Sequence, residues 1–172
     1  MIQRSGIAVV TICRDDAFFL QRFVDYYGGL FGRRHLYVIS HGDTDMVRQV
    51  AEGTNIFPVP AIKTSKFNML HWRTKNGLLS ALRQWYAHVI VVDVDEFIVV
   101  DPATGHNLKS WLETAKTGTV YSPFGLEPVH LRSKEPDPVS DHIIGPRMHA
   151  QVAFHYAKPC IISTRAHLSR GG

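Results

Sequence analysis

Three acidic side chains follow an apolar run in the middle of the chain. The segment HVIVVDVDEF (88–97) places Asp93 and Asp95 two residues apart, with Glu96 directly after them. Carboxylates this close repel one another and resist burial unless a cation lies between them. Mg²⁺ and Mn²⁺ prefer oxygen ligands and commonly bind one or two carboxylates together with substrate phosphates. The spacing therefore predicts a clamp for a divalent metal and a diphosphate. The alternative is that one aspartate caps a turn while the others are solvated.

The elements that would position these carboxylates alternate regularly over the first hundred residues. Apolar runs predict strands at 7–13, 35–40, 55–59 and 88–94, the third near a sheet edge because it contains a proline. Helical spacing predicts a helix capped by Asp15 or Asp16 and ended by Gly28-Gly29, a short helix around 46–51, and a long one over roughly 68–86. Strands that are apolar on both faces and alternate with helices are typical of an α/β fold, a mostly parallel sheet covered by helices on both faces.

The second half of the chain is less regular. It predicts a helix at 108–115 and strands at 119–125 and 158–164, and the proline-rich stretch between these strands has little periodicity. Long irregular stretches in a compact domain are usually functional or mobile. No shift in composition separates this half, so we expect one domain over 1–172, with a binding half (1–102) and a second half (103–172).

The carboxyl ends of parallel strands share one edge, where ligands bind in such sheets. Acidic side chains should therefore gather at that edge. The aspartates that follow predicted strands are Asp15, Asp16, Asp43, Asp45, Asp93 and Asp95.

Composition excludes several classes of protein. The net charge of +4 is carried in short groups such as GRRH (32–35) and RTK (73–75), without the clustered basic face that is usual in nucleic-acid binding. No apolar run approaches the roughly 20 residues that span a bilayer. Cys13 and Cys160 each lie in an apolar run, far apart in sequence, which predicts reduced core residues of a cytoplasmic protein; one long-range disulfide is the alternative.

The order of these motifs resembles the GT-A-type glycosyltransferases. VVDVDEFIV (91–99) is similar to the D-x-D region of the family-two-like bacterial group, which reads roughly hhDhDEFh with h apolar. The opening, TICRDDAFFLQRFVDYYGGLFGRRHLYVISHGDTD (11–45), resembles that group's polar turn, aromatic helix, glycine, strand and second acidic turn. The resemblance covers most of residues 7–102. It departs at Asp15-Asp16, where the group usually has asparagine and glutamate.

The resemblance implies a transferase that uses a nucleotide-sugar donor, a UDP-sugar above all, and Mn²⁺ or Mg²⁺, with inversion. Asp95 would be the principal metal ligand, and Asp93 would contact the ribose or the water shell of the metal. The other nucleotide contacts implied by position are Arg14, Asp15, Asp43, Arg73 and Lys75. The family often adds a late histidine to the metal site; His167 is the nearest in order, and a chain cut short after Gly172 would place the ligand beyond it.

An inverting transferase also needs a general base for the acceptor hydroxyl. Asp141 resembles the family's acidic residue in this region, and its competitors are Glu127, Glu135 and Asp137. Acceptor pockets are built from loops, so a glycan, a lipid and a small molecule all remain open as acceptor. A lipid acceptor would place the protein at the inner face of the membrane.

Two other functions share these features. Sugar-phosphate nucleotidyltransferases also combine an α/β fold with carboxylates and magnesium, but they usually open with a glycine-rich loop, which TICRDDAFF (11–19) lacks. A non-catalytic module that binds metal or nucleotide at its acidic edge is the other alternative.

Overall fold

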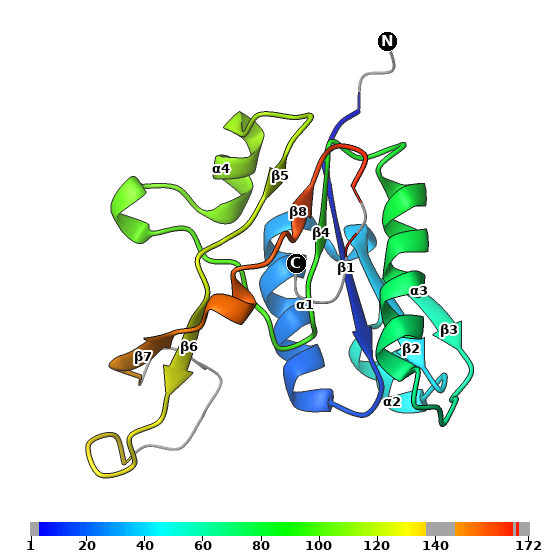
Figure 1. The fold of residues 1–172 in the computed structure, drawn as a ribbon, viewed down its shortest axis with the longest axis horizontal. Helices are drawn as coiled ribbons and strands as arrows, with labels where there is room; N and C mark the ends of the chain where they lie inside the picture. The colour runs from blue at the N-terminus through cyan, green and yellow to red at the C-terminus, as the bar shows by residue number, and fades with distance from the viewer. Residues whose placement is uncertain (1–3, 137–146, 167, 169–172) are drawn as a thin grey trace.

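The fold is α/β, with one six-stranded, mostly parallel sheet between helices (Figure 1). The computed structural model describes residues 4–136, 147–166 and 168. The sheet has the order β3-β2-β1-β4-β8-β5. The first four strands in this order are parallel, and β8 runs antiparallel to both of its neighbours. The strands are β1 (Ile7–Cys13), β2 (Leu36–His41), β3 (Asn55–Val59), β4 (His88–Val91), β5 (Val120–Tyr121) and β8 (Ile161–Ile162).

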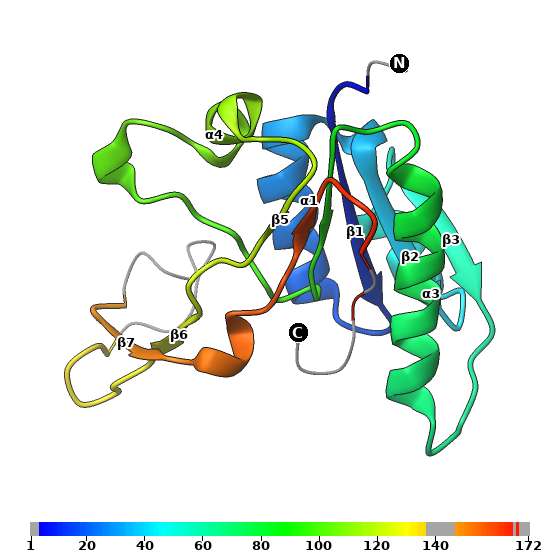
Figure 2. The same cartoon turned by 45° about the horizontal axis from the view of Figure 1, so that its top comes forward.

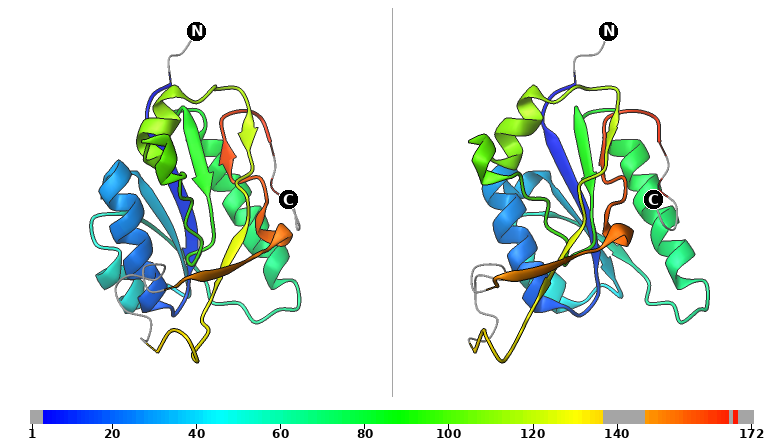
Figure 3. Two further views of the ribbon diagram at one scale, coloured as in Figure 1. Left: turned by 90° about the vertical axis from the view of Figure 1, so that its left-hand side faces the viewer. Right: turned by 60° about the vertical axis from the view of Figure 1, so that its left-hand side comes forward.

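Helices cover both faces of this sheet, as the apolar strands predict (Figure 3). The α-helices are α1 (Ala17–Phe31), α2 (Asp45–Val50), α3 (Phe67–Leu82) and α4 (Leu108–Thr114). Short 3₁₀ turns are η1 (Arg33–His35), η2 (Pro102–Thr104) and η3 (Phe154–Tyr156). On one face, Val9 of β1 belongs to the same apolar core as Phe23 of α1 and Leu112 of α4. On the other, Val10 of β1 shares a core with Leu79 of α3. Successive side chains of β1 point to opposite faces of the sheet and therefore pack into two separate cores.

The end of α1 corrects the sequence prediction. Gly28-Gly29 was expected to stop this helix, but it continues to Phe31 and ends at Gly32, whose φ of 89° is readily adopted by glycine. Gly28 has a packing role instead, since a Cβ there would lie 3.3 Å from Cγ of Arg33 and 3.6 Å from Cδ1 of Leu36. Leu30 and Phe31 pack against the core, and this tertiary packing stabilises the last turn of the helix.

Other boundaries differ at their ends. α3 stops at Leu82 rather than near 86, where the N–H groups of Trp85 and Tyr86 both bond to the Leu82 carbonyl. β4 stops at Val91 rather than 94, because the acidic segment that follows folds into a turn. The predicted strands at 119–125 and 158–164 shrink to the two-residue strands β5 and β8. The edge position predicted for β3 is confirmed.

A second, two-stranded sheet extends from the body of the molecule (Figure 2). It consists of β6 (Leu126–Val129) paired antiparallel with β7 (His149–Val152). We call residues 124–136 and 147–156 the β6–β7 arm. The sequence predicted no strand here, because Pro128 interrupts β6 and β7 carries His149 and Gln151.

The strand order places the topological switch at β1 and β4. The chain runs outward from β1 to β2 and β3, then returns to pair β4 with the other side of β1. In sheets of this kind, ligands bind outside the carboxyl ends of the strands at the switch. The loops after Cys13 and Val91 lie at this position.

The two cysteines and the lengths of the helices bear on the predictions made from composition. Cys13 and Cys160 are both buried and free, as predicted. Within the ranges that the structure describes, no helix has the length and apolar character needed to cross a membrane.

Candidate functional site

The acidic motif forms a closed turn directly after β4. The N–H of Glu96 donates to the Asp93 carbonyl at 3.0 Å, and the N–H of Asp93 donates to Oε2 of Glu96 at 3.0 Å. The Glu96 side chain therefore closes the turn that its own backbone begins. Val94 and Asp95 lie in the middle of the turn, and Asp95 is exposed. This arrangement gives the three acidic residues different environments.

Asp93 is bound by two lysines from distant parts of the chain. Lys75 of α3 donates to Oδ1, and Lys158 donates to Oδ2 at 3.2 Å. Lys158 also lies 2.7 Å from Oε1 of Glu96. Two cations thus neutralise two carboxylates, which removes the repulsion expected for the motif.

The backbone explains how the lysines reach this turn. Lys75 lies one helical turn before Leu79, which is fully buried against the sheet, so the Lys75 side chain emerges on the sheet-facing side of α3. Lys158 precedes Cys160, whose carbonyl accepts a hydrogen bond from the Val91 N–H at 2.8 Å. The strand pairing therefore brings residue 158 beside the end of β4.

Electrostatics favour the charged forms of Asp93 and Lys158. Burial favours the neutral form of Asp93, but the ammonium groups of Lys75 and Lys158 hold the pKa of this carboxyl below its ordinary value. Burial likewise opposes the charge on Lys158, yet the hydrogen bond to Glu96 and the charge of Asp93 raise its pKa. Lys75 and Lys158 also lie 5.2 Å and 5.9 Å from the centre of the Trp72 ring, within reach of a cation–π contact.

Two tyrosines of α1 support the segment that follows the turn. The Tyr27 hydroxyl donates to the Glu96 carbonyl at 3.1 Å and accepts the Ile98 N–H at 3.0 Å. The Tyr26 hydroxyl donates to the Ile98 carbonyl at 2.6 Å. Tyr27 is fully buried, and burial is the main cause that raises its pKa, so the hydroxyl remains a proton donor. Two side chains of α1 therefore hold the backbone of the segment at the end of the turn.

The turns after β1 and β2 lie side by side at the same edge. Asp16 caps α1 by accepting the Phe19 N–H at 2.9 Å, which confirms the prediction that Asp15 or Asp16 caps this helix. The Thr44 hydroxyl donates to the Arg14 carbonyl at 3.1 Å and ties the two turns together. Asp43 has a φ of 49° and pairs with Arg48 at 2.7 Å.

The residues predicted to contact a nucleotide are therefore in different situations. Arg14 and Asp15 are exposed at the end of β1, next to the second turn. Lys75 is buried against Asp93, whereas Arg73 is exposed on another side of α3. Arg73 borders a groove of about 450 Å³ along this helix, which is also lined by Lys66, Met69, Trp72, Asn76 and Leu168.

The candidates for a general base divide into two groups. Glu127 accepts from Nε2 of Gln151 at 2.6 Å, and Glu135 accepts from the Met148 N–H at 2.8 Å and pairs with His149 at 3.0 Å. The His149 hydrogen bond is the main cause that lowers the pKa of Glu135. These contacts all belong to the β6–β7 arm. Asp137, Asp141 and the predicted metal ligand His167 lie outside the described residues.

The described residues do not supply a complete set of metal ligands at this turn. Among residues 4–136, 147–166 and 168, no three histidine, cysteine, aspartate or glutamate side chains are grouped around a point that a metal could occupy. Both oxygens of Asp93 are bound by lysines, while Asp95 makes no hydrogen bond or ion pair with the described residues. This donor set suits a cation that is shared between one carboxylate and the phosphates of a substrate.

Sequence reasoning missed several members of the cluster. Lys158 and Trp72 were not singled out, and Glu96 was given no role of its own. Only pairing between distant segments brings Lys158 to the turn, and a single sequence carries no signal for such a contact. Trp72 lies three residues before Lys75, so helical spacing alone could have placed the two together.

No family model matches this chain, and no curated protein matches it significantly.

Proposed function

We propose that this protein is a metal-dependent glycosyltransferase of the GT-A type. It would move a sugar, with inversion, from a UDP-sugar to a glycan, lipid or small-molecule acceptor, using Mn²⁺ or Mg²⁺. Two features support the proposal: the parallel β3-β2-β1-β4 order, which creates a switch point, and the acidic turn that follows β4 at that point.

The observation that carries the proposal is the difference in environment among the three acidic residues of the turn. Asp93 and Glu96 are held by Lys75, Lys158 and the turn itself, whereas Asp95 is exposed and without a partner among the described residues. An outward-facing carboxylate on a rigid base is the arrangement that a shared metal requires.

Each residue then has a defined task. Asp95 would hold the cation, which, when bound, neutralises the charge that develops on the leaving diphosphate. Lys75 and Lys158 keep Asp93 ionised and fixed, so that the turn does not reorganise during the reaction. Arg14, Asp15 and Asp43 lie on the neighbouring turns, where they would contact the nucleoside, and exposed Arg73 would approach the phosphates.

The proton of the acceptor hydroxyl must be taken up by a base. Glu127 and Glu135 are engaged by arm residues, which favours structural roles for both. We therefore assign the base to Asp141, with Asp137 as its competitor. Asp141→Asn should abolish turnover and leave UDP affinity unchanged.

The proposal is tested by calorimetric titration of the protein with UDP, in Mn²⁺ and in a chelator. We expect binding in Mn²⁺ that is lost in the chelator, and release of UDP from a UDP-sugar in the presence of metal. Pyrophosphate release from a nucleoside triphosphate and a sugar phosphate would indicate a nucleotidyltransferase instead. Absence of any nucleotide binding would leave a non-catalytic module.

A further inference from the structure

The β6–β7 arm has one apolar face that is exposed to solvent. In the strand register, Leu126 lies opposite Val152 and Pro128 opposite Ala150, and cross-strand partners share a face. Leu126 and Val152 are 56% and 49% exposed. The intervening pair, Glu127 with Gln151, occupies the other face. The ribbon is therefore amphipathic, and its apolar side is uncovered in the described chain.

Exposed apolar side chains are concentrated in this arm. Of the twelve large hydrophobic residues that are exposed within the described ranges, six lie here. They are Phe124, Leu126, Met148, Val152, Phe154 and Tyr156. Such concentration marks an interaction surface, whereas single exposed apolar residues need no explanation.

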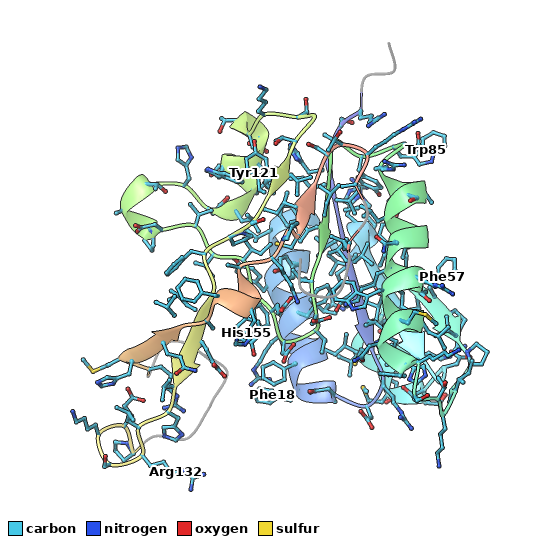
Figure 4. The ribbon with its side chains drawn as sticks, viewed as in Figure 1. Phe18, Phe57, Trp85, Tyr121, Arg132 and His155 are labelled. Atoms are coloured by element: carbon cyan, nitrogen blue, oxygen red, sulfur yellow. The ribbon has the colours of Figure 1, made fainter. Side chains whose placement is uncertain are left out.

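The charges of the arm favour an anionic partner. Arg132 and Lys134 are exposed in the turn after β6, and Arg132 lies at the far end of the arm (Figure 4). Glu135 is buried and bound by Arg147 and His149, and Glu127 lies on the polar face. Within the described residues, the apolar strand face thus carries no carboxylate, and the exposed cations Arg132 and Lys134 lie in the turn at the end of β6.

The two strands of the arm meet closely at its base. The Ala153 N–H donates to the Gly125 carbonyl at 3.0 Å, and Ala153 is buried. A Cβ on Gly125 would lie 2.3 Å from the Ala153 carbonyl oxygen, so the two segments of the arm approach more closely here than a larger residue would permit. The arm projects from the body of the molecule (Figure 1).

We infer that the arm docks on a lipid bilayer that contains anionic phospholipids. Its apolar face would enter the interface between headgroups and acyl chains, while Arg132 and Lys134 bind headgroup phosphates. A projecting surface of phenylalanine, leucine, methionine and valine with cations beside it has the composition of interfacial anchors. A fluid interface accepts such a projection without the matching pocket that a protein partner must supply. This inference does not depend on the proposed transferase activity.

Sedimentation with vesicles tests the inference. We expect the protein to pellet with vesicles of three parts phosphatidylcholine to one part phosphatidylglycerol more than with vesicles of phosphatidylcholine alone. Binding should weaken in high salt because exposed charges are screened. The double variant Leu126→Ser/Val152→Ser should weaken binding by about tenfold or more, since two apolar side chains no longer leave water. Arg132→Glu/Lys134→Glu should abolish the preference for phosphatidylglycerol.

Phe57→Ser supplies the matched control. Phe57 is 54% exposed on edge strand β3, on the side of the molecule away from the arm (Figure 4), so its replacement should leave vesicle binding unchanged. Circular dichroism checks that each variant is folded. The inference is wrong if the wild type pellets with neither vesicle, or if the arm variants bind as well as wild type. Self-association that Leu126→Ser/Val152→Ser abolishes, without vesicle binding, would assign the arm to contacts between copies of the chain.

Discussion

Lys75 and Asp93 form an ion pair whose two partners are buried to very different extents. The Lys75 side chain is 4% exposed and that of Asp93 is 42% exposed. The lysine therefore depends on this carboxylate, because a buried ammonium group without a partner loses its hydration and gains nothing in return. Asp93, by contrast, has Lys158 and solvent as further partners.

This asymmetry predicts unequal effects of the two single substitutions. Asp93→Asn should lower the free energy of unfolding by about 2 kcal/mol, below the 3–5 kcal/mol typical of broken buried pairs because the carboxylate is partly exposed. Lys75→Met should cost less, since methionine packs well beside Trp72 and Asp93 retains Lys158. Urea denaturation measures both. A larger loss for Lys75→Met would contradict the burial argument.

Acid should weaken the cluster in a defined direction. The pKa of Asp93 in the folded protein lies below its ordinary value of 3.8, so its ion pairs contribute stability above that pH and lose it as the pH falls through the folded-state pKa. The melting temperature of the wild type should thus fall as the pH drops from about 5 to below 4. Asp93→Asn should show a shallower fall over this range, and Asp15→Asn, a change of an exposed aspartate, should follow the wild type. Parallel curves for all three proteins would contradict this expectation.

The support behind the turn can be tested by removing single hydroxyl groups. Tyr27→Phe leaves the buried Ile98 N–H without its acceptor and should lower the free energy of unfolding by about 1–3 kcal/mol. Tyr26→Phe is the matched control; this tyrosine is only partly buried, and the loss should be about 1 kcal/mol or less. Equal losses, measured by urea denaturation, would show that the Tyr27 hydroxyl is no more important than its neighbour.

Two glycine-to-alanine changes should have opposite effects. Gly125→Ala places a Cβ 2.3 Å from the Ala153 carbonyl oxygen, so the two strands of the arm must shift apart, and the free energy of unfolding should fall by about 1–3 kcal/mol, as at an overpacked core site. Gly77→Ala meets no atom within 4 Å inside α3 and should stabilise the protein by about 0.5–1 kcal/mol. Thermal unfolding distinguishes the two. A neutral Gly125→Ala would contradict the close contact between the two strands at the base of the arm.

Much of the fold was readable from sequence, because its strands and helices carry strong local patterns. The runs that became β1 and β3 were predicted with their observed bounds, and alternation of strands with helices predicted a mostly parallel sheet. The failures lie where local signals are overridden. Gly28-Gly29 did not stop α1, because packing of Leu30 and Phe31 extends the helix. β6 and β7 were not predicted, because Pro128 and the polar side chains of β7 interrupt the apolar pattern that indicates a strand.

The candidate site was readable only in part. The aspartates after β4 could be found because the sheet edge and the motif coincide. The partners of Asp93 could not all be found, since Lys158 arrives through pairing of the segment before β8 with Val91. The same limit applies to Glu96, whose role as the closing group of the turn follows from its backbone geometry and not from its position in a motif.

The most direct test of the metal-sharing turn is the UDP affinity of Asp95→Ala in Mn²⁺ and in a chelator. Asp95 has no partner among the described residues, so its removal should leave the melting temperature unchanged. We expect affinity in Mn²⁺ to fall by on the order of a hundredfold, the scale of one lost charge-assisted contact, to the level measured in the chelator. Asp45→Ala, which removes an exposed aspartate after β2, should bind UDP as the wild type does. Unchanged, metal-dependent binding by Asp95→Ala would contradict the account.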